Sequence, residues 1–261
     1  MTQAAHDDYQ LPEGFERCPK LRPVAEATSA LERVRAVVTI LANPGGCPWD
    51  GKQTNRTLLR NLIEETYEYV DTVEAGDREG MREELGDLLL QSVFQGVVCE
   101  KDDADPFTLD EVCDRLVDKL VTRHPAVFAP DAGDGADGSD GAEGAGGSGR
   151  SPEEVLALWN AMKRKEKHRT SVLEGISHSQ GAFLRAAKVV HRIAGSEHAD
   201  RLFQAFDHAI RDDADAEAGE RYADEILAVI RRADADGVDV ETALRNRLRD
   251  VEAAVAQAER G

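Results

Sequence analysis

Apolar residues recur every three or four positions along most of this 261-residue chain, which is the spacing of helices that bury one face. The first such segment covers about residues 26–41. The later segments are, in order, about 55–75, 78–100, 109–123, 151–167, 180–193, 199–211, 219–233 and 239–259. No run of alternating β-branched residues predicts a strand. The pattern therefore predicts an all-α fold in the form of a helical bundle.

Two segments interrupt the helical pattern. Residues 1–24 contain prolines at positions 12, 19 and 23, which predict a flexible tail without helix. Residues 129–150 are rich in glycine, alanine and aspartate and contain no large apolar side chain, so they predict a flexible acidic loop. The expected domains are the tail over 1–24, a first helical domain over 25–168 that contains the loop, and a second helical domain over 169–261.

The charge of the chain limits its partners. The formal net charge is −19, which argues against a nucleic-acid polymer or an anionic membrane surface as the main partner. A nucleotide remains compatible, because a few cations or bound metal ions override the global field locally. Four cysteines without CxxC spacing, no apolar signal segment and no run of about 20 apolar residues predict a cytoplasmic protein with no membrane span.

Two clusters of acidic residues lie on consecutive predicted helices. Glu64, Glu65 and Glu68 fall within an arc of about 100° on the first of these helices. Glu84 and Asp87 are three residues apart on the next helix, which is apolar nearly all round after Asp87 and is therefore predicted to be a core helix. Carboxylates in such a place repel one another unless a cation joins them.

The short turn between these helices predicts an antiparallel pair in which the two clusters meet. Glu68 lies eight residues before Gly76, and Glu84 lies eight residues after it, so the clusters sit at matched heights. Oxygen ligands select hard ions, first Mg²⁺ or Mn²⁺. A di-iron site is disfavoured because no histidine follows these glutamates by three residues. A solvated acidic helix face is the alternative. Gly86, inside the second helix, predicts the close approach of another backbone.

Five sequence blocks, in this order, resemble the MazG-type nucleoside triphosphate pyrophosphohydrolases. They are GCPWDGKQT, EETYE, EELGDLLLQ, DKLVTRHPAVF and VLALWNAMKRKEK. The resemblance covers residues 31–167 apart from the acidic loop, and Ala126 stands where the family often has a histidine. It implies an all-α, Mg²⁺-dependent enzyme, with Mn²⁺ as a possible substitute, that hydrolyses NTPs or dNTPs to the monophosphate and pyrophosphate in nucleotide pool clean-up.

The resemblance also implies a role for each site residue. The expected metal ligands are Glu65, Glu68, Glu84 and Asp87, and Glu64 is expected to orient or deprotonate the attacking water as the catalytic residue. The expected nucleotide contacts are Lys119 with Arg123 and Trp159 with Lys163. Each of these pairs is spaced i,i+4, so its members project from one helix face. A surface position for Lys119 and a core position for Trp159 are the alternatives.

The second domain resembles a decayed copy of the first. The segment ERYADEIL at 220–227 aligns with EELGDLLL at 83–90, so that Asp224 matches Asp87 but Arg221 replaces Glu84. No EExxE pattern occurs after residue 168. We therefore expect an inactive second domain that serves packing or dimerisation, in a homodimer. The open alternatives are a narrow dUTP or modified-dCTP pyrophosphatase and a non-catalytic helical metal-binding regulator.

Overall fold

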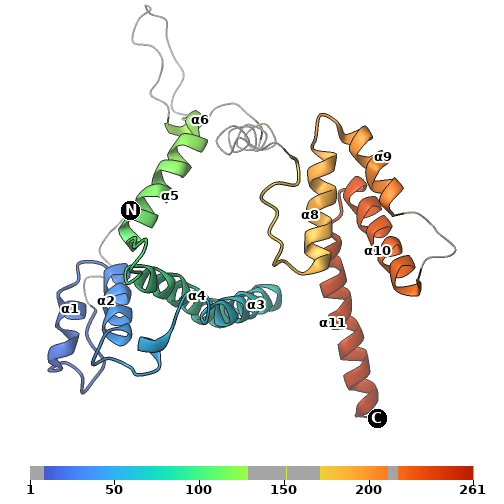
Figure 1. Cartoon of the computed structure of the whole chain (residues 1–261). Coiled ribbons are helices and arrows are strands. Elements are labelled where there is room, and N and C mark those ends of the chain that lie inside the picture. The colour runs from blue at the N-terminus through green and yellow to red at the C-terminus, as the bar shows by residue number, and fades with distance from the viewer. Residues whose placement is uncertain (1–8, 129–150, 152–170, 211–216, 261) are drawn as a thin grey trace, which may run out of the picture. The chain divides into compact units, whose positions relative to one another are not determined.

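The computed structural model of the chain describes residues 9–128, 151, 171–210 and 217–260. Every regular element within these ranges is a helix, so the all-α prediction is confirmed there (Figure 1). The chain divides into two compact units, residues 1–149 and 150–261. The loop predicted over 129–150 and the helix predicted over 151–167, which carries Trp159 and Lys163, lie outside the described residues.

The first unit consists of short helices followed by three longer ones. Its elements are η1 (Pro19–Leu21), α1 (Arg22–Glu26), α2 (Ala30–Ala42), η2 (Asp50–Lys52), α3 (Leu59–Ala75), α4 (Arg78–Cys99), α5 (Leu109–Arg123) and α6 (Pro125–Phe128). α2 begins four residues later than predicted, because Ser29 caps it: the Ser29 hydroxyl accepts from the Glu32 amide, and the Glu32 carboxylate accepts from the Ser29 amide.

The prediction that no helix forms before residue 24 is wrong. The segment η1–α1 covers residues 19–26, and the side chain of Val24 is buried with 2% exposure. Proline does not prevent this helix because Pro23 lies in its first turn, where the missing amide would have no helical partner anyway.

α3 and α4 form an antiparallel hairpin, joined by a tight turn. Gly76 ends α3 with a φ of 68°, and its amide donates to the carbonyls of Thr72 and Val73. Asp77 then caps α4 by accepting from the amides of Glu79 and Gly80. This turn fixes which residues of the two helices lie opposite each other.

The glycines of α4 do not behave as the sequence predicts. A Cβ placed on Gly86 would have nothing within 4 Å, so the predicted close approach at this position is wrong. The close approaches occur at the two ends of the helix instead. A Cβ on Gly80 would lie 2.8 Å from Thr72 Cγ2, and one on Gly96 would lie 3.2 Å from Leu109 Cδ1. Gly80 therefore packs against α3, and Gly96 packs against the start of α5.

The core of the first unit lies at one end of α4. It contains apolar side chains from α2, from the start of α3 and from the C-terminal half of α4: Val38, Ala42, Leu58, Val93, Phe94 and Val97. Before this core, by contrast, Leu85 in the N-terminal half of α4 is 54% exposed, and Leu89 at the middle of the helix is 40% exposed. The prediction of a core helix is thus correct only for the end of α4 at which Val93, Phe94 and Val97 pack in one cluster with Val38 and Ala42 of α2.

The second unit is a smaller group of helices around α8. Its elements are α8 (Ala182–Ala194), α9 (Ala199–Ala209), α10 (Ala218–Ala235) and α11 (Val240–Glu259). α8 packs against the other three, and its residues Val190 and Ile193 are buried, as is Ile230 of α10. In the described parts of both units, no helix is long and apolar enough to cross a membrane.

Candidate metal centre

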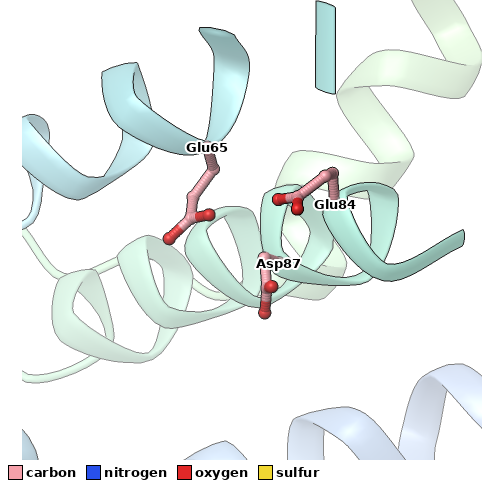
Figure 2. A group of neighbouring side chains, drawn as sticks. All are labelled: Glu65, Glu84 and Asp87. Atoms are coloured by element: carbon pink, nitrogen blue, oxygen red, sulfur yellow. The ribbon is translucent and has the colours of Figure 1, made fainter. Parts of the chain in front are cut away.

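Three carboxylates from α3 and α4 converge in the middle of the hairpin. Oxygen atoms of Glu65, Glu84 and Asp87 all lie within 4.8 Å of one another. Figure 2 shows Glu65 projecting from α3 and the other two projecting from the neighbouring helix. The matched heights of the two clusters predict this meeting of α3 and α4, and the antiparallel hairpin produces it.

The local structure explains why these three side chains share one place. Glu84 and Asp87 are three residues apart on α4, so they project from the same face. Gly76, at the turn, lies eleven residues after Glu65 and eight residues before Glu84. Because α3 and α4 are antiparallel, these similar separations place Glu65 opposite the segment of α4 that carries Glu84 and Asp87. All three side chains are half-buried, so a ligand can reach them from solvent.

The electrostatics of this cluster are unfavourable without a cation. Partial burial raises the pKa of Glu65, and so do a hydrogen bond with Glu68 and the charges of Asp87, Glu68 and Glu84. Partial burial also raises the pKa of Glu84, followed by the charges of Glu68, Asp87 and Glu83. In the part of the chain that the structure describes, no lysine or arginine forms an ion pair with Glu65, Glu84 or Asp87.

The donor set fits a hard divalent cation. Among the described residues, the group that could hold an ion offers only carboxylate oxygens, which suit Mg²⁺ and Mn²⁺, and includes neither the histidine nor the thiolate ligands that suit zinc. A bound cation would also reverse the shifts in pKa, because it favours the ionised form of each carboxyl group.

The two remaining acidic candidates lie beside this cluster rather than in it. Glu68 is exposed and contacts the Glu65 carboxyl group, but it is not among the three residues within 4.8 Å. Glu64 is exposed, and its helical position turns it about 100° from Glu65. Glu68 therefore lies at the edge of the cluster, whereas Glu64 projects from α3 in another direction.

The predicted nucleotide contacts are only partly described. On α5, Lys119 is exposed whereas Arg123 is buried with 7% exposure, so two residues of one helix face have different surroundings. Trp159 and Lys163 fall outside the described ranges. The described residues thus bring together Glu65, Glu84 and Asp87, and the contact of the four other residues with a nucleotide stays a prediction.

Sequence reasoning missed Gln91, which is buried on α4 with 6% exposure. A signal was present in the sequence: Gln91 interrupts the apolar run after Asp87, and it lies on the helix face of Glu84 and Asp87. A polar residue that interrupts an apolar run on the face of a candidate site is a candidate member of that site.

Comparisons with known proteins place the chain in a family. The model of the MazG nucleotide pyrophosphohydrolase domain matches residues 53–128, which include all three clustered carboxylates. A nucleoside triphosphate pyrophosphohydrolase of Escherichia coli (strain K12) is 31% identical over 87% of this chain and 88% of that protein. The chain therefore belongs to the family of MazG nucleoside triphosphate pyrophosphohydrolases, as the sequence resemblance predicts.

Two further relatives show how far the similarity extends. A nucleoside triphosphate pyrophosphohydrolase of Mycobacterium tuberculosis is 36% identical over 82% of this chain, which spans 56% of the length of that relative. An uncharacterized 26.1 kDa protein of Streptomyces cacaoi is 39% identical over 76% of this chain and 71% of that protein.

Proposed function

We propose that this chain hydrolyses a nucleoside triphosphate, NTP or dNTP, to the monophosphate and pyrophosphate in a reaction that depends on Mg²⁺, with Mn²⁺ as a substitute. The observation that carries the proposal is the convergence of three half-buried carboxylates, which form no ion pair with any lysine or arginine that the structure describes, in a chain of the MazG family. The net charge of −19 is compatible with an anionic substrate if metal ions neutralise the phosphate charge locally.

The residues of the site divide into those that hold the ion and those that act on the water. Glu65, Glu84 and Asp87, with Glu68 at their edge, would hold the ion. When bound, Mg²⁺ neutralises phosphate oxygens and lowers the pKa of a coordinated water. Glu64 orients the attacking water and accepts its proton. The water oxygen forms a bond to the α-phosphorus, the bond from this phosphorus to the bridging oxygen breaks, and pyrophosphate leaves with that oxygen.

The basic and aromatic residues would hold the nucleotide. Lys119 and Arg123 are proposed to contact polyphosphate oxygens, and Lys163 is proposed to add a third positive charge. Trp159 would provide a face for stacking of the base. The support for these four roles is their match to the sequence blocks of the family and their i,i+4 spacing.

We further propose that the second unit is inactive. Asp224 aligns with Asp87, but the described part of this unit contains no group of three carboxylates like that in the first unit. The full-length Asp224→Asn variant should keep its rate within about two-fold, whereas Asp87→Asn should lose at least about 100-fold. Equal losses in the two variants would contradict an inactive second unit.

A panel of substrates tests the main proposal. Canonical and oxidised NTPs and dNTPs are incubated with the full-length protein and Mg²⁺, and release of pyrophosphate is measured against release of orthophosphate. We expect pyrophosphate from at least one class of substrate, and no product when EDTA removes the metal. Orthophosphate as the only product, or no product from any nucleotide, would refute the proposed reaction.

A further inference from the structure

The side chain of Gln91 is buried in the first unit with an unpaired oxygen. The residue is 6% exposed, and its Oε1 atom accepts no hydrogen bond from any residue that the structure describes. Buried amide oxygens are nearly always paired, because an unpaired one has lost its hydration without compensation. This position therefore indicates a donor that none of the described residues supplies.

The contacts of neighbouring residues show which way Gln91 faces. Glu84, Gln91 and Gln95 fall within an arc of about 40° on α4. Glu84 meets Glu65 of α3, and Gln95 meets Asn55, just before α3, through a hydrogen bond of 2.6 Å from Asn55 Nδ2 to Gln95 Oε1. Gln91 lies between these two contacts, so it faces α3 as well.

Gln91 also lies beside the carboxylate cluster. It follows Asp87 by one helical turn, which is about 6 Å along the axis of α4. Mg²⁺ and Mn²⁺ usually keep several water molecules at about 2.1 Å, and a hydrogen bond adds about 2.8 Å. A water on an ion held by Glu65, Glu84 and Asp87 can therefore reach an acceptor that lies about 4–5 Å from the ion.

We propose that Gln91 is a positioning residue whose Oε1 atom accepts a hydrogen bond from a water molecule bound to the divalent ion. This inference rests on the proposed metal site and adds a residue to it. The hydrogen bond provides the missing donor for Gln91 and fixes the orientation of one coordinated water. The buried amide oxygen should therefore lower the stability of the metal-free protein and raise the stability of the metal-bound protein.

Replacement of Gln91 by methionine separates these two effects. Gln91→Met keeps the length of the side chain and removes the unpaired oxygen, so the melting temperature of the metal-free protein should rise by about 2–4 °C. The affinity for Mn²⁺, measured without nucleotide by electron paramagnetic resonance, should fall by about 10-fold or more. A glutamine with only a structural role would leave the affinity for Mn²⁺ unchanged.

Gln95→Met is the matched control on the same helix face. It breaks the bond with Asn55, so the metal-free protein should melt at a lower temperature while the affinity for Mn²⁺ stays within about two-fold. Gln91→Leu serves as a second apolar variant in case Gln91→Met does not fold. Unchanged Mn²⁺ affinity in a folded Gln91 variant, beside a wild type that binds Mn²⁺, would overturn the role of Gln91 alone. Absence of Mn²⁺ binding in the wild type would overturn the metal site itself.

Discussion

At the scale of single residues, the site is defined by carboxyl groups whose charges oppose one another. Partial burial and neighbouring carboxylates raise the pKa values of Glu65 and Glu84 in the metal-free protein. A raised carboxyl pKa means that the ionised form is disfavoured in the folded state. Without the ion, ionised carboxyl groups in this cluster destabilise the folded protein. Metal binding nevertheless requires them to be ionised.

Replacement of one carboxylate by an amide should lower the activity without lowering the stability of the metal-free protein. Glu84→Gln removes a metal ligand, so pyrophosphate release should fall by about 100-fold or more, while the melting temperature of the metal-free protein should not fall. Glu83→Gln changes the adjacent, exposed residue and should keep most of the activity. An active Glu84→Gln enzyme would contradict the role of Glu84 as a ligand.

The pH dependence of stability follows from the direction of the same shifts. Because the pKa values of Glu65 and Glu84 are higher in the folded state than in the unfolded state, the folded state takes up protons more readily as the pH falls through the folded pKa. The contribution of these groups is therefore most favourable at low pH and is lost as the pH rises. The melting temperature of the metal-free wild type, measured between about pH 7.5 and about pH 5, should approach that of Glu84→Gln as the pH falls. A constant difference would contradict the shift at Glu84.

Residue spacing predicted part of the site, and packing determined the rest. The i,i+3 spacing of Glu84 and Asp87 and the short turn predict that the acids of α4 face α3. Spacing alone does not decide which of Glu64, Glu65 and Glu68 points inward, because this depends on the rotation of α3 about its axis. That rotation follows from contacts distant in sequence, such as the hydrogen bond between Asn55 and Gln95.

At the scale of elements, the ends of the helices were predictable where local chemistry sets them. α5 begins after Thr108, whose hydroxyl accepts from the Glu111 amide, and it ends before Pro125, and both bounds agree with the prediction. The predicted start of α3 at about residue 55 was too early, since Asn55 instead donates to Gln95. A side chain that bonds forty residues away leaves no pattern in the local sequence.

Alanine substitutions at the two glycines in the first half of α4 should change the free energy of unfolding in opposite directions. Gly80→Ala places a Cβ 2.7 Å from Asp77 Oδ2 and 2.8 Å from Thr72 Cγ2, so it should lower the free energy of unfolding by about 1–2 kcal/mol. Gly86→Ala meets nothing within 4 Å and should raise the free energy of unfolding by up to about 1 kcal/mol. Urea unfolding monitored by circular dichroism measures both. The same sign in both variants would contradict this description of the hairpin.

At the scale of the whole molecule, the described part of the first unit exposes an apolar stripe on α3. Leu59, Ile63 and Tyr67 follow one another at four-residue intervals on α3 and are 50%, 55% and 66% exposed. Helical geometry places Ile63 about 160° from Glu65, so the stripe does not compete with the metal site. A homodimer remains a prediction from the sequence, and a charge placed in this stripe tests it.

A charge within this stripe should separate the two copies. Ile63→Glu would bury a carboxylate in an apolar contact, so light scattering after gel filtration should give a dimeric wild type and a monomeric variant. Val238→Glu, at a residue of the second unit that is 50% exposed, is the matched control and should stay dimeric. A dimeric Ile63→Glu variant would exclude the stripe as the contact surface.

Because α4 carries its buried apolar side chains from position 93 onward and its clustered carboxylates at positions 84 and 87, mutations can change the apolar core and the carboxylate cluster separately. Exposed positions in the first part of the helix, such as Leu85, can change size and polarity without opening a void in the close-packed interior. Substitutions at these exposed positions should therefore leave the apolar core of the first unit intact, whereas substitutions at the buried positions should not.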